Sequence, residues 1–228
     1  MFARILGFAF VLFLIGGLPV LSHLSTRQDD LLLLPRKSLY FSAAASQWLL
    51  AIITVLVIVA TSEKLAVFKV LAAWSFVKWT AAVATISLAG LALALVLERY
   101  GWWPEESRWV EHLIPRTREE KLWSLLVLAP TAGFCEELIY RGYLLAQLTR
   151  YFHSVDAAWA VSSVAFGLAH TYQKFDGAVR AALLGALLAY PVVRLGSLYP
   201  SIAAHFLIDA VALVWLGPVS LREKDHQL

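Results

Sequence analysis

Long apolar segments alternate with shorter polar connectors along the whole chain of 228 residues. A helix needs about 20 apolar residues to cross the hydrocarbon core of a membrane. The apolar segments cover residues 5–21, 41–60, 81–97, 122–148, 155–169, 178–193 and 198–216. This pattern predicts an all-α protein, a polytopic membrane helical bundle of about seven transmembrane helices.

Two N-terminal segments need an interpretation of their own. Segment 5–21 follows Arg4 and reads either as a signal peptide or as a transmembrane helix. We favour the helix, because further spans follow and Leu21-Ser22-His23 is a poor cleavage site. Residues 62–79 place three lysines among Leu, Val, Phe and Trp. That mixture favours an amphipathic helix that lies in the membrane interface.

Polar connectors separate the spans. The longest, residues 98–121, is rich in Glu and Arg, and we expect it to be a loop at one membrane face. Thr117 and Glu120 have the spacing of a capping box at the start of the helix that follows. Residues 25–37 form another connector, and residues 222–228 form a short polar tail.

The composition supports a membrane protein. Hydrophobic residues make up 60% of the chain and charged residues 15%, with a mean hydropathy of +0.71. These values exclude an ordinary soluble globule. The net charge of +3 is spread over the connectors, so no nucleic-acid partner is expected. The single cysteine excludes an internal disulfide.

Charged side chains are rare inside the predicted spans. Segment 122–148 carries only Glu136, Glu137 and Arg141. An ionised group at the membrane centre costs roughly 2.5–3.5 kcal/mol on insertion scales, so such groups pair or have a function. Glu137 and Arg141 are four residues apart on one helix face, whereas Glu136 is rotated by roughly 100°. One carboxylate is therefore neutralised and the other is available.

Two later spans also carry ionisable groups. His170 closes the segment 155–169, and Phe166 lies one helical turn before it. His205 and Asp209 are four residues apart, so they share one face of their span. A carboxylate, two imidazoles and an aspartate on three spans form a set that can bind and activate water in a protected cavity.

Each group also has a structural interpretation. Glu137 and Arg141 alone could form an ion pair at a helix end. His170 alone could be a solvated histidine at the interface. His205 and Asp209 alone could clamp two helices by hydrogen bonds.

Other protease mechanisms lack the residues that they need. Ser201 lies four residues before His205, but no Gly-x-Ser-x-Gly environment surrounds it. Cys135 has no histidine near it in the sequence and suits a small buried side chain. An aspartyl protease would require a second aspartate inside the spans.

Three motifs, in their order and on separate helices, resemble one protein family. The motifs are Glu136-Glu137-x-x-x-Arg141, Phe166-x-x-x-His170 and His205-x-x-x-Asp209. They are similar to those of the CPBP family of intramembrane endopeptidases, also called ABI, whose best-known members are the CAAX prenyl proteases. The resemblance implies one integral membrane domain over 1–228, with N-terminal spans and connectors over 1–120 and a catalytic core over 121–217. The active site is therefore expected inside the C-terminal half.

The resemblance implies a role for each residue of the first two motifs. Glu136 would be the general base that takes a proton from the attacking water, and His170 would hold and polarise that water. Glu137, through Arg141, would orient the site rather than react. Phe166 is assigned to substrate binding.

The third motif departs from the CAAX prenyl proteases at one position. His205 and Asp209 would stabilise the oxyanion of the tetrahedral intermediate or hold the water. Asp209 stands where the CAAX prenyl proteases have Asn, and a carboxylate donates a hydrogen bond only when it is protonated. This difference puts the oxyanion role in doubt and favours metal ligation slightly.

The sequence leaves the need for a metal open. His170, His205 and a carboxylate would form a three-ligand zinc site with an open position for water. The candidate ligands are Glu137, His170, His205 and Asp209. The same residues suit a glutamic mechanism without metal, and no compact HExxH signature decides between the two.

The expected function is intramembrane endopeptidase activity on a peptide bond near the C-terminus of a membrane protein or peptide, whether lipidated or anchored otherwise. The alternative is a non-catalytic membrane scaffold or bacteriocin-immunity-type protein that uses the same polar cluster. A proton-linked transporter lacks the internal repeat that would support it. A bacterial inner membrane is expected from size and family distribution, while topology stays open because positive charge is divided evenly among the connectors.

Overall fold

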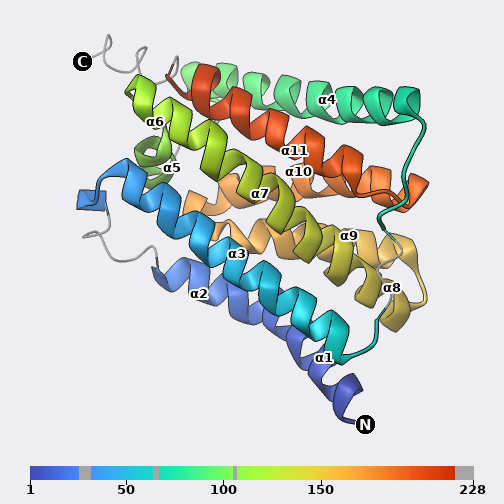
Figure 1. Ribbon diagram of the computed structural model, residues 1–228. Helices are drawn as coiled ribbons and strands as arrows, with labels where there is room; N and C mark the ends of the chain where they lie inside the picture. Colours follow the sequence, from blue (N-terminus) through green and yellow to red (C-terminus); the bar gives the residue numbers. More distant parts are fainter. Residues whose placement is uncertain (26–31, 64–66, 105–106, 219–228) are drawn as a thin grey trace.

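The computed structural model describes residues 1–25, 32–63, 67–104 and 107–218. Within these ranges the chain is helical and forms no β-strand (Figure 1). The elements are α1 (Phe2–Leu12), η1 (Phe13–Gly17), α2 (Leu18–Ser25), α3 (Arg36–Ala60), α4 (Ala73–Arg99), α5 (Arg108–Leu113), α6 (Arg118–Trp123), η3 (Ser124–Leu128), α7 (Ala129–Glu137), η4 (Leu138–Leu144), α8 (Leu145–Phe152), α9 (Val155–Ala169), η5 (Thr171–Gln173), α10 (Lys174–Leu195), α11 (Tyr199–Val211) and η6 (Ala212–Leu216). Element η5 is a 3-10 turn and the other η segments are π-helical.

Most of these elements join into helices that are long enough to cross a membrane. Among the described residues, six stretches are long and apolar enough: Phe2–Ser25, Arg36–Ala60, Ala73–Arg99, Arg118–Phe152, Thr171–Leu195 and Tyr199–Leu216. Helix α9 is apolar but has 15 residues, fewer than a span normally needs. The prediction of a polytopic all-α membrane bundle is confirmed, and one of its seven expected spans is a shorter helix.

The stretch Arg118–Phe152 has well-defined ends. Thr117 Oγ1 accepts a hydrogen bond from the backbone N–H of Glu120 at 3.1 Å, and the Glu120 carboxylate accepts one from Thr117 N–H at 3.0 Å. The predicted capping box is therefore confirmed. The stretch ends at His153, which has a left-handed backbone, and Ser154 then caps α9. Two π-helical segments interrupt the stretch on either side of α7, a feature that is frequent at functional sites.

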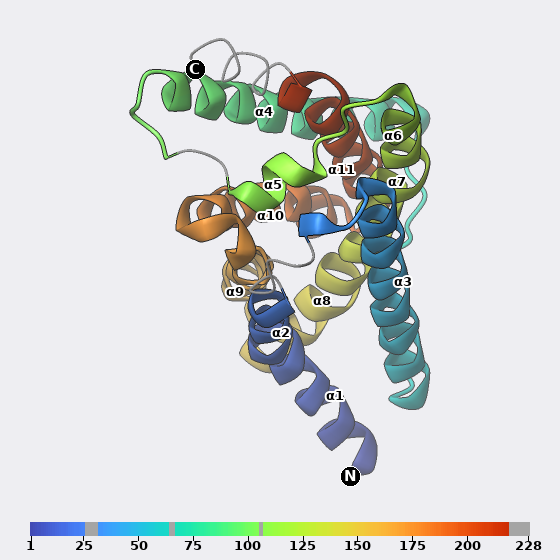
Figure 2. The ribbon, with the colours of Figure 1, turned by 90° about the vertical axis from the view of Figure 1, so that its left-hand side faces the viewer.

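Helix α7 lies at the centre of the site-bearing half, between α3 and α11 (Figures 1 and 2). Helix α9 packs against both α8 and α10, and α4 lies along α11. Gly133 allows the close approach of α7 to α11, since a Cβ at this position would lie 3.1 Å from Phe206 N. Gly167 does the same for α9 and α10, where a Cβ would lie 2.5 Å from Ala178 O. These contacts bring the three motif-bearing helices together.

The prediction of an interfacial helix over residues 62–79 is wrong. Residues 67–72 are not helical, and residues 73–79 are the first turns of α4. Phe68 forms an isolated bridge with Ser197, and Leu198 N–H donates to Val67 O at 2.7 Å. This tertiary pairing outweighs the amphipathic pattern. Lys64, the middle of the connector 25–37, two glutamates of 98–121 and the tail 222–228 lie outside the described residues.

Candidate active site

The three sequence motifs converge on one carboxylate oxygen. Glu136 is near the end of α7, His170 follows α9, and His205 is in the middle of α11. Glu136 Oε2 lies 4.0 Å from His170 Nε2 and 3.9 Å from His205 Nε2. The side chains of Glu136 and His170 are 15% and 17% exposed, and that of His205 is 4% exposed. The structure thus brings these groups together in a place that is mostly, but not fully, enclosed by the protein.

Hydrogen bonds at the far ring nitrogens orient both imidazoles. His170 Nδ1 lies 2.7 Å from the carbonyl oxygen of Phe166, and His205 Nδ1 lies 2.8 Å from Glu137 Oε1. A carbonyl or carboxylate oxygen accepts, so each Nδ1 carries the proton and donates it. Both Nε2 atoms therefore face Glu136, and in a neutral ring each Nε2 offers a lone pair.

Glu137 belongs to a closed network behind His205. Its Oε1 lies 3.0 Å from Arg141 Nη1, and both side chains are buried. Arg141 Nη2 donates to Gly185 O at 3.0 Å, which ties η4 to α10. The pairing of Glu137 with Arg141 expected from their spacing is present, and Glu137 also orients His205.

Asp209 lies at the edge of the cluster. Its Oδ2 is 3.8 Å from His205 Nε2, and its side chain is more exposed than that of His205. Three carboxylates thus surround the His205 ring, with Glu137 at Nδ1 and with Glu136 and Asp209 near Nε2. The His205 ring is thus enclosed by acidic side chains on both of its nitrogens.

Comparison with known proteins finds a family match for the part of the chain that carries the site. Residues 118–211 match the family described as type II CAAX prenyl endopeptidase Rce1-like. This segment belongs to the CAAX protease family. The match contains all three motifs, so the family resemblance of the motifs is confirmed. No curated protein and no solved structure matches the chain.

Within the CAAX protease segment, the Phe166 side chain is buried between Arg141 and His170. The side chain is 1% exposed, and Arg141 stacks on its ring at 4.2 Å from the ring centroid. Its ring also lies edge-on to Tyr140 and packs beside His170. Substrate contact by Phe166 stays a prediction, and this burial argues against it. The ring packs between the Glu137–Arg141 network and His170, and the Phe166 carbonyl orients that histidine.

Within the CAAX protease segment, the Glu136 carboxylate accepts a hydrogen bond from a residue outside the bounds of the segment. Gln47 of α3 donates from Nε2 to Glu136 Oε1 at 2.7 Å. Beside it, Trp48 donates to Thr131 Oγ1 at 3.2 Å and stacks on Phe134, which holds α3 against α7. Sequence reasoning missed Gln47. An amide in the middle of the apolar segment 41–60 was the available signal, because polar groups in spans need a partner.

The zinc site that the sequence left open stays a prediction. Among the described residues, no group of three or more His, Cys, Asp and Glu side chains is arranged to hold a metal ion. Ligand atoms of a tetrahedral zinc lie about 3.4 Å apart, given bonds of about 2.0–2.2 Å. Here the Nε2 to carboxylate distances are 3.8–4.0 Å. Glu137, a candidate ligand, contacts His205 at Nδ1, away from the Nε2 atoms.

Proposed function

We propose that this protein is an intramembrane endopeptidase that uses Glu136 to activate a water molecule. The observation that carries the proposal is the convergence of Glu136 Oε2 with His170 Nε2 and His205 Nε2 at 4.0 and 3.9 Å. These distances are too long for direct hydrogen bonds. A water at about 2.8 Å from both atoms of such a pair would have ordinary hydrogen-bond geometry, with an angle of roughly 90° between them.

The two histidines have different tasks in this proposal. His170 donates only to the Phe166 carbonyl, so its Nε2 accepts a hydrogen bond from the water and orients it. Glu136 takes the water proton as the oxygen attacks the peptide carbonyl carbon. In this proposal the His205 ring carries a proton on each nitrogen, and its Nε2 donates to the developing oxyanion. The proton on Glu136 then passes to the leaving amine, and the peptide bond breaks.

Gln47 positions the base in this mechanism. Its hydrogen bond holds Oε1 of Glu136, which leaves Oε2 to face the histidines. Gln47 Oε1 is buried and makes no hydrogen bond within the described residues. Gln47 is thus a positioning residue that acts through Glu136.

The proposed substrate is a membrane-anchored protein or peptide, cut near its C-terminus. The family to which residues 118–211 belong and the location of the cluster among membrane-spanning helices support this class. A substrate segment must enter between the helices to reach Glu136, and its peptide bond must leave regular secondary structure before water can attack it. Selectivity then depends on which segments can enter.

Cleavage of membrane-anchored reporters tests the function. Purified protein in lipid vesicles is incubated with reporter peptides that carry a lipidated or apolar anchor and different C-terminal tails, and the products are identified by mass spectrometry. We expect cleavage by the wild type and its loss in Glu136→Gln. Glu119→Gln is the matched control, because Glu119 is exposed and pairs with Lys37 at a helix end. Equal cleavage by Glu136→Gln would make the cluster structural and would support the scaffold alternative.

A further inference from the structure

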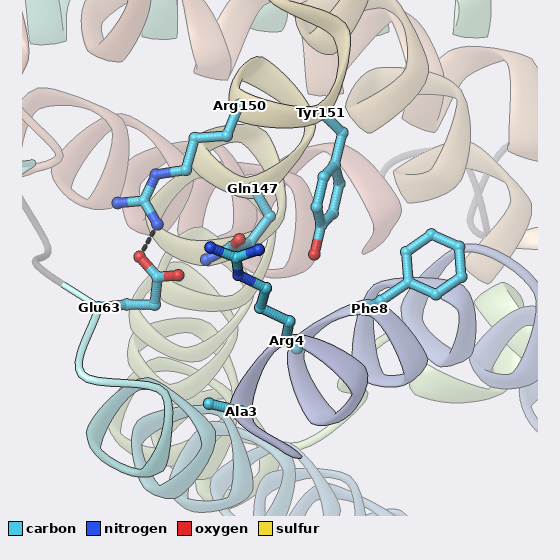
Figure 3. A pocket seen from close by; sticks show the side chains of 8 residues that line it. Ala3, Arg4, Phe8, Glu63, Gln147, Arg150 and Tyr151 are labelled. Atoms are coloured by element: carbon cyan, nitrogen blue, oxygen red, sulfur yellow. Dashed lines mark ion pairs between the residues drawn. The ribbon is translucent and has the colours of Figure 1, made fainter. Parts of the chain in front are cut away.

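A second polar site lies apart from the candidate active site. A pocket of about 380 Å³ opens between α1, α8 and the residues that follow α3. Figure 3 shows the side chains that face it, among them Arg4, Gln147 and Tyr151, with the Arg150–Glu63 ion pair at one side. Neither the mechanism nor the three motifs use any of these residues.

The pocket lies where three membrane spans end. Arg4 is in the first turn of Phe2–Ser25, Glu63 follows Arg36–Ala60, and Arg150 is in the last turn of Arg118–Phe152. These three ends lie at the same end of the bundle (Figure 1). Side chains at the ends of spans reach the headgroup region of the bilayer. The pocket therefore opens at the level of lipid headgroups.

Two unpartnered donors make this pocket a binding site rather than a surface hollow. Arg4 makes no ion pair within the part of the chain that the structure describes. Gln147 is 5% exposed and lines the pocket, yet its amide makes no hydrogen bond to the described residues. The Gln147 side chain is otherwise enclosed and lines the pocket, so its amide donors are available to a ligand there.

The charge and shape of the pocket select an anion with an apolar tail. Arg4 and Arg150 carry two positive charges against one negative charge on Glu63. A guanidinium matches the oxygens of a phosphate in a two-point contact, and the Gln147 amide and Tyr151 hydroxyl are further donors. Phe8 stacks edge-on against Tyr151 and gives the pocket an apolar wall. Acyl chains of a lipid would continue along that wall into the bilayer.

We propose that this pocket binds the phosphate of an anionic phospholipid headgroup, held by Arg4, Gln147 and Arg150. The binding is independent of peptidase activity. Glu63 competes with the phosphate for Arg150, since the two side chains form an ion pair.

Lipid retention measured by native mass spectrometry tests the proposal. Detergent-purified protein is titrated with phosphatidylglycerol or with neutral phosphatidylcholine of the same acyl chains. We expect preferential binding of phosphatidylglycerol to the wild type and a loss of about tenfold in its affinity in Arg4→Gln, the size that one charged hydrogen bond contributes. Arg4 is exposed and makes no ion pair among the described residues, so this variant keeps the fold. Arg108→Gln, a change on a different helix, is the control and should bind as wild type does.

A second variant should increase the affinity for phosphatidylglycerol instead of lowering it. Glu63→Gln frees Arg150 and removes the negative charge, so it should raise phosphatidylglycerol affinity severalfold. A merely structural pocket would not gain affinity. Equal retention of the two lipids by the wild type, or equal binding by wild type and Arg4→Gln, would overturn the proposal. Binding of inorganic phosphate without a preference for phosphatidylglycerol would also overturn it, because the ligand would then be a soluble anion.

Discussion

Two neighbouring regions of one helix differ in how much space their carboxylates have. Around Glu137, the side chains of Arg141, His205 and Phe166 form a closed and buried network. Around Glu136, one oxygen is held by Gln47, and the other faces two imidazoles at distances that leave room for a small molecule. The two glutamates are adjacent in the sequence, so the helical rotation of roughly 100° alone separates them.

The difference shows how a single helix serves structure and chemistry together. The closed region stabilises the packing of α7, α10 and α11 and sets the orientation of His205. In the proposed reaction, His205 acts beside Glu136 of the open region in the orientation that Glu137 sets. A substitution in the open region should therefore change activity alone, whereas one in the closed region should change stability and activity together.

The largest effect is expected at the open carboxylate. Glu136→Gln removes the proposed general base but keeps the size of the side chain, so peptide cleavage should fall by about 10²–10⁴-fold. The midpoint of thermal unfolding should stay within a few degrees of the wild type. Cleavage rate and unfolding midpoint measured on the same preparation check this separation. A large fall in the midpoint would place Glu136 in the closed network instead.

Substitution of Glu137, the buried carboxylate of the closed region, should lower the stability of the protein. Glu137→Gln leaves Arg141 buried without its counter-charge, which costs roughly 3–5 kcal/mol of unfolding free energy. Denaturant titration of the protein in detergent measures this loss. The double variant Glu137→Leu with Arg141→Met should recover much of the stability, since an apolar pair of similar volume needs no compensation. It should not recover activity, because His205 Nδ1 has lost its acceptor.

The third effect is expected at Gly133, where α7 comes into close contact with α11. Gly133→Ala would place a Cβ 3.1 Å from Phe206 N, so α11 must shift and His205 with it. Overpacking of this kind costs about 1–3 kcal/mol, and cleavage should fall by about tenfold or more. Gly90→Ala is the matched control, since nothing lies within 4 Å of a Cβ there. Equal stability and activity of the two variants would contradict the close approach.

The fourth effect is expected at Gln47 of α3, which donates a hydrogen bond to Glu136 in the open region. Gln47→Leu removes the hydrogen bond to Glu136 Oε1, and we expect kcat to fall by about tenfold, the size that one charge-assisted hydrogen bond contributes. KM and the unfolding midpoint should change little. Steady-state kinetics separate the two parameters. An increase in KM at constant kcat would make Gln47 a substrate contact rather than a positioning residue.

The smallest effect is expected at the edge of the cluster. Asp209→Asn retains the shape of the side chain and replaces one of three carboxylates around His205. We expect cleavage to change by less than about fivefold, because Asp209 Oδ2 lies 3.8 Å from His205 Nε2, too far for a direct hydrogen bond. Cleavage assays over a range of pH check this. A loss as large as that of Glu136→Gln would give Asp209 a direct part in the reaction.

The local features of the site could be predicted because they depend on spacing within one helix. The pairing of Glu137 with Arg141 and the placement of His205 and Asp209 on one face follow from helical geometry. The capping box at Thr117 follows from residue type at a fixed spacing. Each of these features forms between residues that the chain holds close together.

Other features depended on distances between helices. The sequence indicates a substrate contact for Phe166, which stays a prediction, but it does not show that α9, α10 and η4 enclose the ring. Gln47 went unnoticed because its partner lies 89 positions away on another helix. The interfacial helix over 62–79 failed because Val67 and Phe68 pair with residues near position 198.

The sequence by itself determined the membrane spans, the order of the three motifs and the neutral pair in the first motif, since these follow from hydropathy and helical periodicity. Only the tertiary structure decided how far Glu136 lies from the two imidazoles, which ring nitrogens point towards it, and that α3 contributes Gln47. Those choices depend on how closely α7 approaches α11 and α3. Small residues such as Gly133 set that approach, and a one-dimensional pattern does not contain the distance between two helices.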